Sequence, residues 1–276
     1  MRRPAPQAPT AGLVLSLVLL FPGAALAQDL WPEARSEPTL DLEWVRPRVD
    51  NADFTALAGF WRLTAAIPVD DKSRVVVVLP YTVAASDAAF SPDETSAIGN
   101  IYVGAQIGSP GSTLTGHIGA YLPTAPDAAG DPAILGFIGD FDRLEAYLPN
   151  TLAMRAGLQY RQRDPGGIVY GFRFGGSGVA PTGGGGGTAE LLLDYGLLFG
   201  VEQPRVRITG TLDGRLFATA GGELNLADRT VNQAGVELAL LGWRVEPRLM
   251  VRVPMDEMLD GVGPMLGLGA TFRLGR

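Results

Sequence analysis

The chain has 276 residues, of which 37 are glycine, with one histidine, one lysine, no cysteine and a formal net charge of −7. The absence of cysteine excludes disulfides and a lipidated cysteine, and a single histidine leaves no His- or Cys-based metal site. The negative charge argues against nucleic acid as a partner, because phosphate binding requires a concentrated positive surface. We therefore expect no metal, no cofactor and no nucleic-acid partner.

The first 27 residues have the pattern of a secretory signal peptide. Paired arginines precede an apolar run over 12–21, and Ala25 and Ala27 present small side chains at the two positions that signal peptidase reads. The run is shorter than the roughly 20 residues that a membrane-spanning helix needs. We expect export by the general secretory route, cleavage after Ala27 and a single domain over 28–276.

Period-two alternation of apolar and polar residues recurs along the rest of the chain. In 151–161, for example, Met154 and Leu158 fall on one face, whereas Arg155 and Gln159 fall on the other. This pattern is typical of strands with one side in lipid and one in water, and a tilted strand crosses a bilayer in roughly 9 to 11 residues. It predicts about twelve strands, at 39–49, 55–67, 74–83, 97–107, 113–122, 151–161, 167–175, 188–200, 205–213, 230–241, 244–253 and 264–274.

The connections between these strands alternate in length. The short ones are 68–73, 108–112, 162–166, 201–204 and 242–243, and the long ones are 84–96, 123–150, 176–187, 214–229 and 254–263. Bacterial outer-membrane barrels have short periplasmic turns and long external loops, whereas a soluble β-sandwich has no need of such regularity. The sequence therefore predicts an all-β fold, a closed antiparallel transmembrane barrel in the outer membrane.

The longest connection, 123–150, contains the one helical pattern outside the signal peptide. Asp131 suits the N-cap and Pro132 the first helical position. Apolar residues at spacings of three or four form one stripe, with the charged residues of 140–143 mostly off it. The stripe consists of Ile134, Phe137, Ile138, Phe141, Leu144 and Leu148. Because long loops are often functional, we predict a lid or constriction built on Ile134, Phe137 and Phe141. Folding into the lumen or resting on the lipid surface are the alternatives.

Alternation also assigns charged side chains and the histidine to the water-facing side. These candidate solute-path residues are Arg155, Arg161, Arg173, Arg205, Arg207, Arg248, Arg252, Glu190, Asp194, Glu237 and His117. Rings of arginine favour anions, and guanidinium planes stack on aromatic rings. Ladders of arginine and acid also brace the inside of a barrel, and both interpretations stay open. Twelve strands fall between side-chain-filled and open barrels, so we expect a narrow, partly plugged lumen.

Enzyme chemistry finds little support in the sequence. His117 stands alone on the polar face of 113–122, and the glycine run 183–187 is not followed by the Lys-Ser or Lys-Thr of a phosphate-binding loop. We expect that the protein is not an enzyme. The alternatives are an outer-membrane lipid hydrolase built around His117 and a pore-less anchoring barrel with binding loops.

Two stretches resemble a known family. They are IGNIYVGA at 98–105 and GAYLPTA at 119–125. They are similar to the Gly-acid-hydrophobic strand and the hydrophobic-Pro-Thr-Gly strand end of the outer-membrane proteins named for the MetA pathway of phenol degradation. Here Asn100 replaces the usual acid and Ala125 the usual glycine. The resemblance implies a membrane channel that admits small organic compounds.

Pattern and resemblance together predict an outer-membrane channel or uptake porin for small, anionic or aromatic solutes. The expected partners are outer-membrane lipid and lipopolysaccharide, the solute, and the barrel-assembly machinery.

Overall fold

A computed structural model describes residues 33–49, 58–84, 95–126, 130–183, 188–219, 229–256, 259 and 261–275. The predicted cleavage site after Ala27 lies outside these residues. The described strands are β1 (Thr39–Val49), β2 (Gly59–Pro68), β3 (Ser73–Ala84), β4 (Thr95–Ile98), β5 (Tyr102–Ile107), β6 (Leu114–Tyr121), β7 (Thr151–Arg163), β8 (Ile168–Pro181), β9 (Glu190–Glu202), β10 (Val206–Phe217), β11 (Thr230–Leu240), β12 (Val245–Pro254) and β13 (Val262–Arg273).

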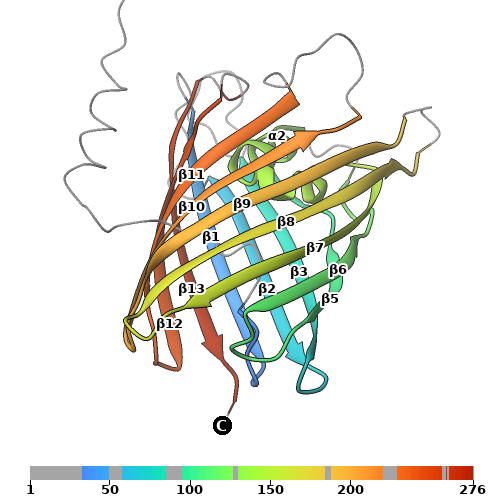
Figure 1. Ribbon diagram of the computed structural model, residues 1–276. Coiled ribbons are helices and arrows are strands. Elements are labelled where there is room, and N and C mark those ends of the chain that lie inside the picture. Colours follow the sequence, from blue (N-terminus) through green and yellow to red (C-terminus); the bar gives the residue numbers. More distant parts are fainter. Residues whose placement is uncertain are drawn as a thin grey trace, which may run out of the picture.

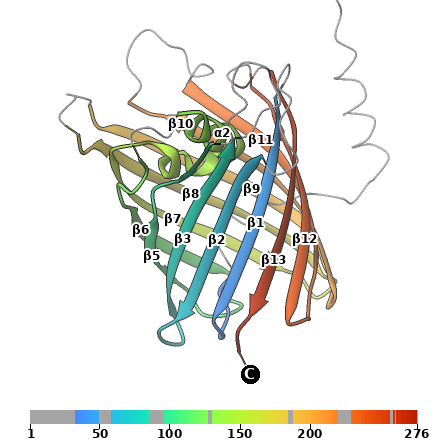
Figure 2. The ribbon, with the colours of Figure 1, turned by 180° about the vertical axis from the view of Figure 1, so that it is seen from behind.

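These strands form one antiparallel sheet that closes on itself. β1 pairs with β13 on one side and with β2 on the other, so the first and last strands meet. Figure 1 shows the resulting barrel, and Figure 2 shows β13, β1, β2 and β3 side by side where it closes. Closure removes the unpaired edges that an open sheet would leave in lipid.

One wall position is shared by two short strands. β4 pairs with the end of β3 at Tyr81↔Ile98, and β5 pairs with its beginning at Val78↔Tyr102. The described strands therefore make a closed barrel of twelve strands, as the alternation predicts. The predicted continuous strand over 97–107 is wrong in one respect, because it is interrupted at 99–101.

The side chains of each strand alternate between the outside and the inside of the barrel. In β7, Met154 and Leu158 are 55% and 56% exposed, whereas Ala153 and Arg155 are 0% and 2% exposed. Leu266 and Leu268 repeat the outward pattern in β13, and Met265 and Gly267 beside them are buried. An apolar band around a barrel with a polar interior is what contact with lipid on the outside requires.

Short connections and long connections lie at opposite ends. The turns after β2, β5, β7, β9 and β11 lie at the end that carries the C terminus (Figure 1). The turn after β11 uses Gly242 with φ +79°, a conformation that glycine adopts without steric cost. The turn after β2 is held by Asp70, whose Oδ1 accepts hydrogen bonds from the backbone N–H groups of Lys72 and Ser73, both at 2.7 Å.

The long connection between β6 and β7 contains two helical segments, α2 (Gly130–Gly139) and the 3-10 helix η1 (Phe141–Tyr147). A helix in this connection is confirmed, but the single continuous helix is wrong, because the chain breaks at Asp140 with φ −140° and ψ 54°. Glycines allow the close packing at the break. A Cβ at Gly139 would lie 2.6 Å from the Phe60 ring, and one at Gly136 would lie 2.2 Å from the Tyr147 ring. Among the described residues, no helix is both long and apolar enough to cross a membrane.

Candidate functional site

Residues 130–148, which include α2 and η1 and are called the plug below, lie within the end of the barrel opposite the C terminus (Figures 1 and 2). Wall arginines donate directly to plug carbonyl groups. Arg252 Nη1 lies 3.2 Å from the Gly139 oxygen, and Arg215 donates to the oxygens of Phe141 and Asp142 at 3.0 Å and 2.8 Å. The broken helix exposes these carbonyls, so the arginines replace hydrogen bonds that a continuous helix would have made.

The charged residues at the break are buried. Asp140 Oδ1 lies 3.0 Å from Arg143 Nη1, and its Oδ2 lies 3.4 Å from Arg62 Nη1. Asp142 accepts a hydrogen bond from Gln233 Nε2 at 3.1 Å. Although these residues lie mostly off the predicted apolar stripe, Asp140, Asp142 and Arg143 are each less than 5% exposed.

Glu145 has the densest set of partners. Arg215 binds it through two parallel contacts, Nη1 to Oε2 at 2.9 Å and Nη2 to Oε1 at 3.1 Å. Arg155 Nη1 lies 3.5 Å from Oε1, and the Ser177 hydroxyl donates to the same oxygen. A bidentate arginine–carboxylate pair is strong and directional, and removing one member of a buried pair typically costs about 3–5 kcal/mol.

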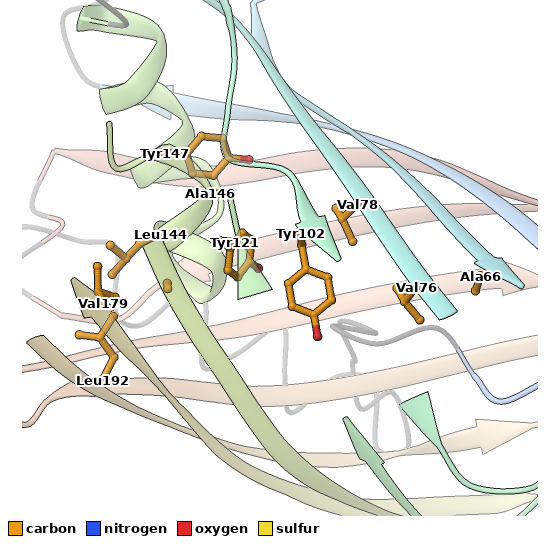
Figure 3. Close-up of a cluster of buried hydrophobic side chains, with 11 residues drawn as sticks. Ala66, Val76, Val78, Tyr102, Tyr121, Leu144, Ala146, Tyr147, Val179 and Leu192 are labelled. Atoms are coloured by element: carbon orange, nitrogen blue, oxygen red, sulfur yellow. The ribbon is translucent and has the colours of Figure 1, made fainter. Parts of the chain in front are cut away.

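Apolar plug residues pack against the wall beside this carboxylate. Leu144 belongs to a buried cluster with Val179 and Leu192, which lie next to it in Figure 3. Phe141 packs with Val231 and Leu259 in a second cluster.

The three predicted constriction residues therefore have different surroundings. Phe141 is buried, and Phe137 packs against the edge of the first cluster. Ile134 is 58% exposed, which places it outside the packed group.

Most of the predicted lumen residues form ion pairs inside the barrel. Pairs within the wall are Arg155–Asp194 (2.8 Å), Arg161–Glu202 (2.5 Å), Arg173–Asp213 (2.5 Å), Arg207–Glu237 (3.0 Å), Arg248–Asp41 and Arg252–Glu43 (2.9 Å). Two residues lie elsewhere. Arg205 is exposed in the turn between β9 and β10, because β10 begins only at Val206, so its placement in the lumen is wrong. Glu190 lies at the start of β9 and accepts a hydrogen bond from the Thr219 hydroxyl at 2.7 Å.

His117 lies in the middle of β6, opposite Gln106 and Gly157. A Cβ at Gly157 would lie 2.5 Å from the imidazole Cε1, so the glycine makes room for the ring. Arg155, Asp194 and Arg173 are charged neighbours of this ring. Ser177, a buried serine inside the barrel, donates to Glu145. Ser177 therefore has a carboxylate of the plug as its hydrogen-bond acceptor.

Residues 33–38 cross the other end of the lumen. Glu33 lies 3.0 Å from Arg161 and 3.6 Å from Arg207, and Arg74 donates to its backbone oxygen at 2.7 Å. Burial raises the pKa of Glu33, but Arg161, Arg207 and Arg35 outweigh it and hold that pKa below its ordinary value. Glu33 therefore pairs with the wall arginines in its charged form.

Two cavities lie beside the inserted segments in the part of the chain that the structure describes. A cavity of about 40 Å³ is lined by residues that include Asp41, Tyr102, Arg143 and Arg248. A larger one of about 230 Å³ adjoins Glu33 at the C-terminal end of the barrel. The plug and residues 33–38 therefore occupy the two ends of the lumen in the described conformation.

Sequence reasoning missed several residues that make these contacts inside the barrel. The predicted strand ends at 213 and leaves out Arg215, whereas β10 continues to Phe217. The alternation places Ser177 and Glu145 in external loops and Glu33 in no element. The alternation of Asp213 and Arg215 with Gly214 between them could have extended the predicted strand. No local pattern indicates that a loop folds inward.

The fold and the site together define a transmembrane β-barrel with a plugged, polar lumen. No protein-family model matches the sequence, and no curated protein matches it. Among the described residues, no group of three or more His, Cys, Asp or Glu side chains is arranged to hold a metal ion.

Several solved structures share the fold. An outer membrane channel from Pseudomonas putida F1 has a TM-score of 0.57 at 11% identity, covering 90% of this chain and 99% of that one. The NanC porin has a TM-score of 0.50 at 8% identity, covering 85% and 100%. LpxR from Salmonella typhimurium has a TM-score of 0.49 at 12% identity, covering 86% and 100%. At these identities the likeness concerns the fold alone.

Proposed function

We propose that this protein is an outer-membrane channel for small solutes whose lumen is closed by the plug in the described conformation. One observation carries the proposal: the obstruction belongs to a connection between strands and is attached to the wall mainly by side chains. The twelve-stranded wall does not depend on the plug for its β6–β7 or β3–β5 pairing. A plug of this kind can leave the lumen while the barrel stays closed.

The solute preference that we propose is for anions. To the ion pairs inside the barrel the plug contributes the carboxylates of Asp140, Asp142 and Glu145 against the guanidinium of Arg143. Its withdrawal removes more negative than positive charge, so the open lumen becomes more positive. Fixed positive charge in a narrow pore raises the local concentration of anions. The resemblance to the MetA-pathway family adds organic compounds as the solute class.

The pore-less anchor is the second candidate, and the filled lumen favours it. Conductance of the wild type, compared with a variant in which a short Gly-Ser linker replaces 132–148, separates the two functions. A channel shows openings of the wild type in a planar bilayer and a higher single-channel conductance after this deletion, whereas the wild type of an anchor stays silent. Removal of the glycine run 183–187 from another connection is the matched control and leaves conductance unchanged. Equal conductance of the wild type and the plug deletion, with both barrels fully assembled, contradicts the proposal.

A further inference from the structure

The wall around Glu145 forms a site for a carboxylate. Arg155, Ser177, Asp194 and Arg215 come from the four consecutive strands β7 to β10, and strand register brings them together at Arg155↔Ser177 and Asp194↔Arg215. All four are less than 10% exposed. Their positions are therefore fixed by the barrel and not by the plug.

This wall site has one more positive than negative charge. Asp194 accepts a hydrogen bond from Arg215 Nε at 2.6 Å and forms an ion pair with Arg155 Nη2 at 2.8 Å. One wall carboxylate is therefore shared by two guanidinium groups. Glu145 supplies the second carboxylate. When the plug leaves, the two Nη atoms of Arg215 and the Ser177 hydroxyl lose their partner, and a planar carboxylate matches that set of donors.

The plug also indicates which chemical group a bound solute should carry beside its carboxylate. Phe141 lies four residues before Glu145 and packs with Val231, while Leu144 packs with Val179 and Leu192. Withdrawal of the plug would expose these apolar wall residues beside the arginines. An occupant that carries a hydrophobic ring next to its carboxylate satisfies both parts of the site.

We infer that Arg155, Ser177 and Arg215 bind the carboxylate of an apolar or aromatic organic acid, which competes with Glu145 for the wall and thereby opens the plug. The inference rests on the proposed channel function and names its substrate class and its trigger. The acid binds only where Glu145 is absent, so it shifts the equilibrium toward the withdrawn plug. Transport then begins with displacement of a carboxylate of the protein's own chain.

The natural absence of cysteine makes withdrawal of the plug measurable. Ala146 is 2% exposed and small, so Ala146→Cys places a single buried thiol on the plug. With the purified barrel in lipid vesicles, the rate of maleimide labelling reports how often the plug is withdrawn. We expect saturating benzoate to increase this rate by about tenfold or more, the size expected from charged hydrogen bonds. Benzamide, which has the same shape without the charge, and chloride at equal ionic strength leave the rate unchanged.

Variants test the site itself. Glu145→Gln raises the labelling rate without benzoate by about tenfold, because the plug loses its charge-assisted contacts. Arg215→Lys keeps the charge but loses the two-pronged geometry, so the half-effective benzoate concentration rises by about tenfold. Arg248→Lys is the matched control, because the carboxylates facing Arg248 are Asp41, Glu43 and Glu237 of the wall. It leaves the half-effective concentration unchanged.

The outcomes separate this inference from the proposed function. Equal effects of benzoate and benzamide, or equal effects of Arg215→Lys and Arg248→Lys on the benzoate response, overturn the carboxylate site even if the plug deletion conducts. A silent plug deletion overturns the channel, and the labelling assay still reports whether benzoate binds the site.

Discussion

Replacement of Asn100 by Asp tests how the plug is attached to the wall. Asn100 is 0% exposed and lies in the interruption between β4 and β5. Its amide nitrogen donates to the backbone oxygens of Glu145 and Leu148 at 2.8 Å and 2.7 Å, and its amide oxygen accepts from Ala125 N at 2.9 Å. Asn100→Asp keeps the size and the accepting oxygen but turns the donor toward the plug into a second acceptor.

The expected cost follows from those carbonyls. Leu148 O keeps the Thr151 hydroxyl as a donor at 2.8 Å, so Glu145 O is the acceptor that loses its side-chain donor. A buried acceptor that loses its donor typically costs about 1–3 kcal/mol. About 2 kcal/mol changes the ratio of withdrawn to inserted plug by about 30-fold.

The introduced thiol of Ala146→Cys measures this change, because Ala146 O accepts the backbone N–H of Asn100 at 2.6 Å. We expect the labelling rate to rise by about 30-fold in the Asn100→Asp background, while the heat-dependent gel mobility of the folded barrel stays unchanged. Gln106→Glu makes the same amide-to-acid change in β5 at a residue that lines the larger cavity, and it should not alter the rate. An unchanged rate in Asn100→Asp, or a barrel that no longer assembles, refutes the assigned role.

Two further predictions concern charge. Burial raises the pKa of Asp140 to about 7, against the opposing effects of Arg62 and Arg252. Because this pKa exceeds the ordinary 3.8 of a withdrawn plug, protonation stabilises insertion below about pH 4 and this contribution is lost as the pH rises to about 7. Channel opening should increase over that range, and Asp140→Asn should abolish the dependence; a flat wild-type profile contradicts it. In a salt gradient, the reversal potential of the plug-deletion variant should indicate a preference for anions. Arg207→Gln should reduce this preference, whereas Arg205→Gln, in the exposed turn, should not. A preference for cations contradicts the prediction.

The strands were predictable because each one is constrained on both faces. Lipid on one side and a polar lumen on the other require strict alternation, which the sequence displays wherever a strand crosses, as at Met154, Arg155 and Leu158. The break at 99–101 was not predictable on this basis. Ile98 and Tyr102, which a continuous strand would place on one face, are 47% and 1% exposed, so the interruption changes the face on which these positions lie. The partner of Asn100 N there is a backbone oxygen of Ala146, far along the chain.

The plug shows a different limit of sequence reasoning. An apolar stripe is visible at Phe141 and Leu144, but the acids between and beside them indicate solvent unless their partners are known. Those partners include Arg62 and Arg215, which lie about 70 or more residues away in sequence. Charge pairing over such separations leaves no local signature, so an inward-folded loop has the same appearance as a solvated one.

The lumen arginines can brace the barrel and select solutes with the same side chains. Asp194 of the wall is shared by Arg155 and Arg215, and Glu145 of the plug supplies the second carboxylate to that pair. Glu43 is likewise shared by Arg62 and Arg252, and Asp140 of the plug lies 3.4 Å and 3.8 Å from them.

At Arg155 and Arg215 the wall alone has too few carboxylates, and Glu145 of the plug makes up the difference, whereas Asp140 is shared between wall arginines and Arg143 of the plug. Charge selectivity is therefore a property of the wall and the plug together. With the plug inserted, the arginines are neutralised and hold the lumen closed. Under the proposed function, withdrawal of the plug leaves the same arginines facing the solute path with an excess of positive charge, and the contacts that close the lumen also determine which solutes favour its opening.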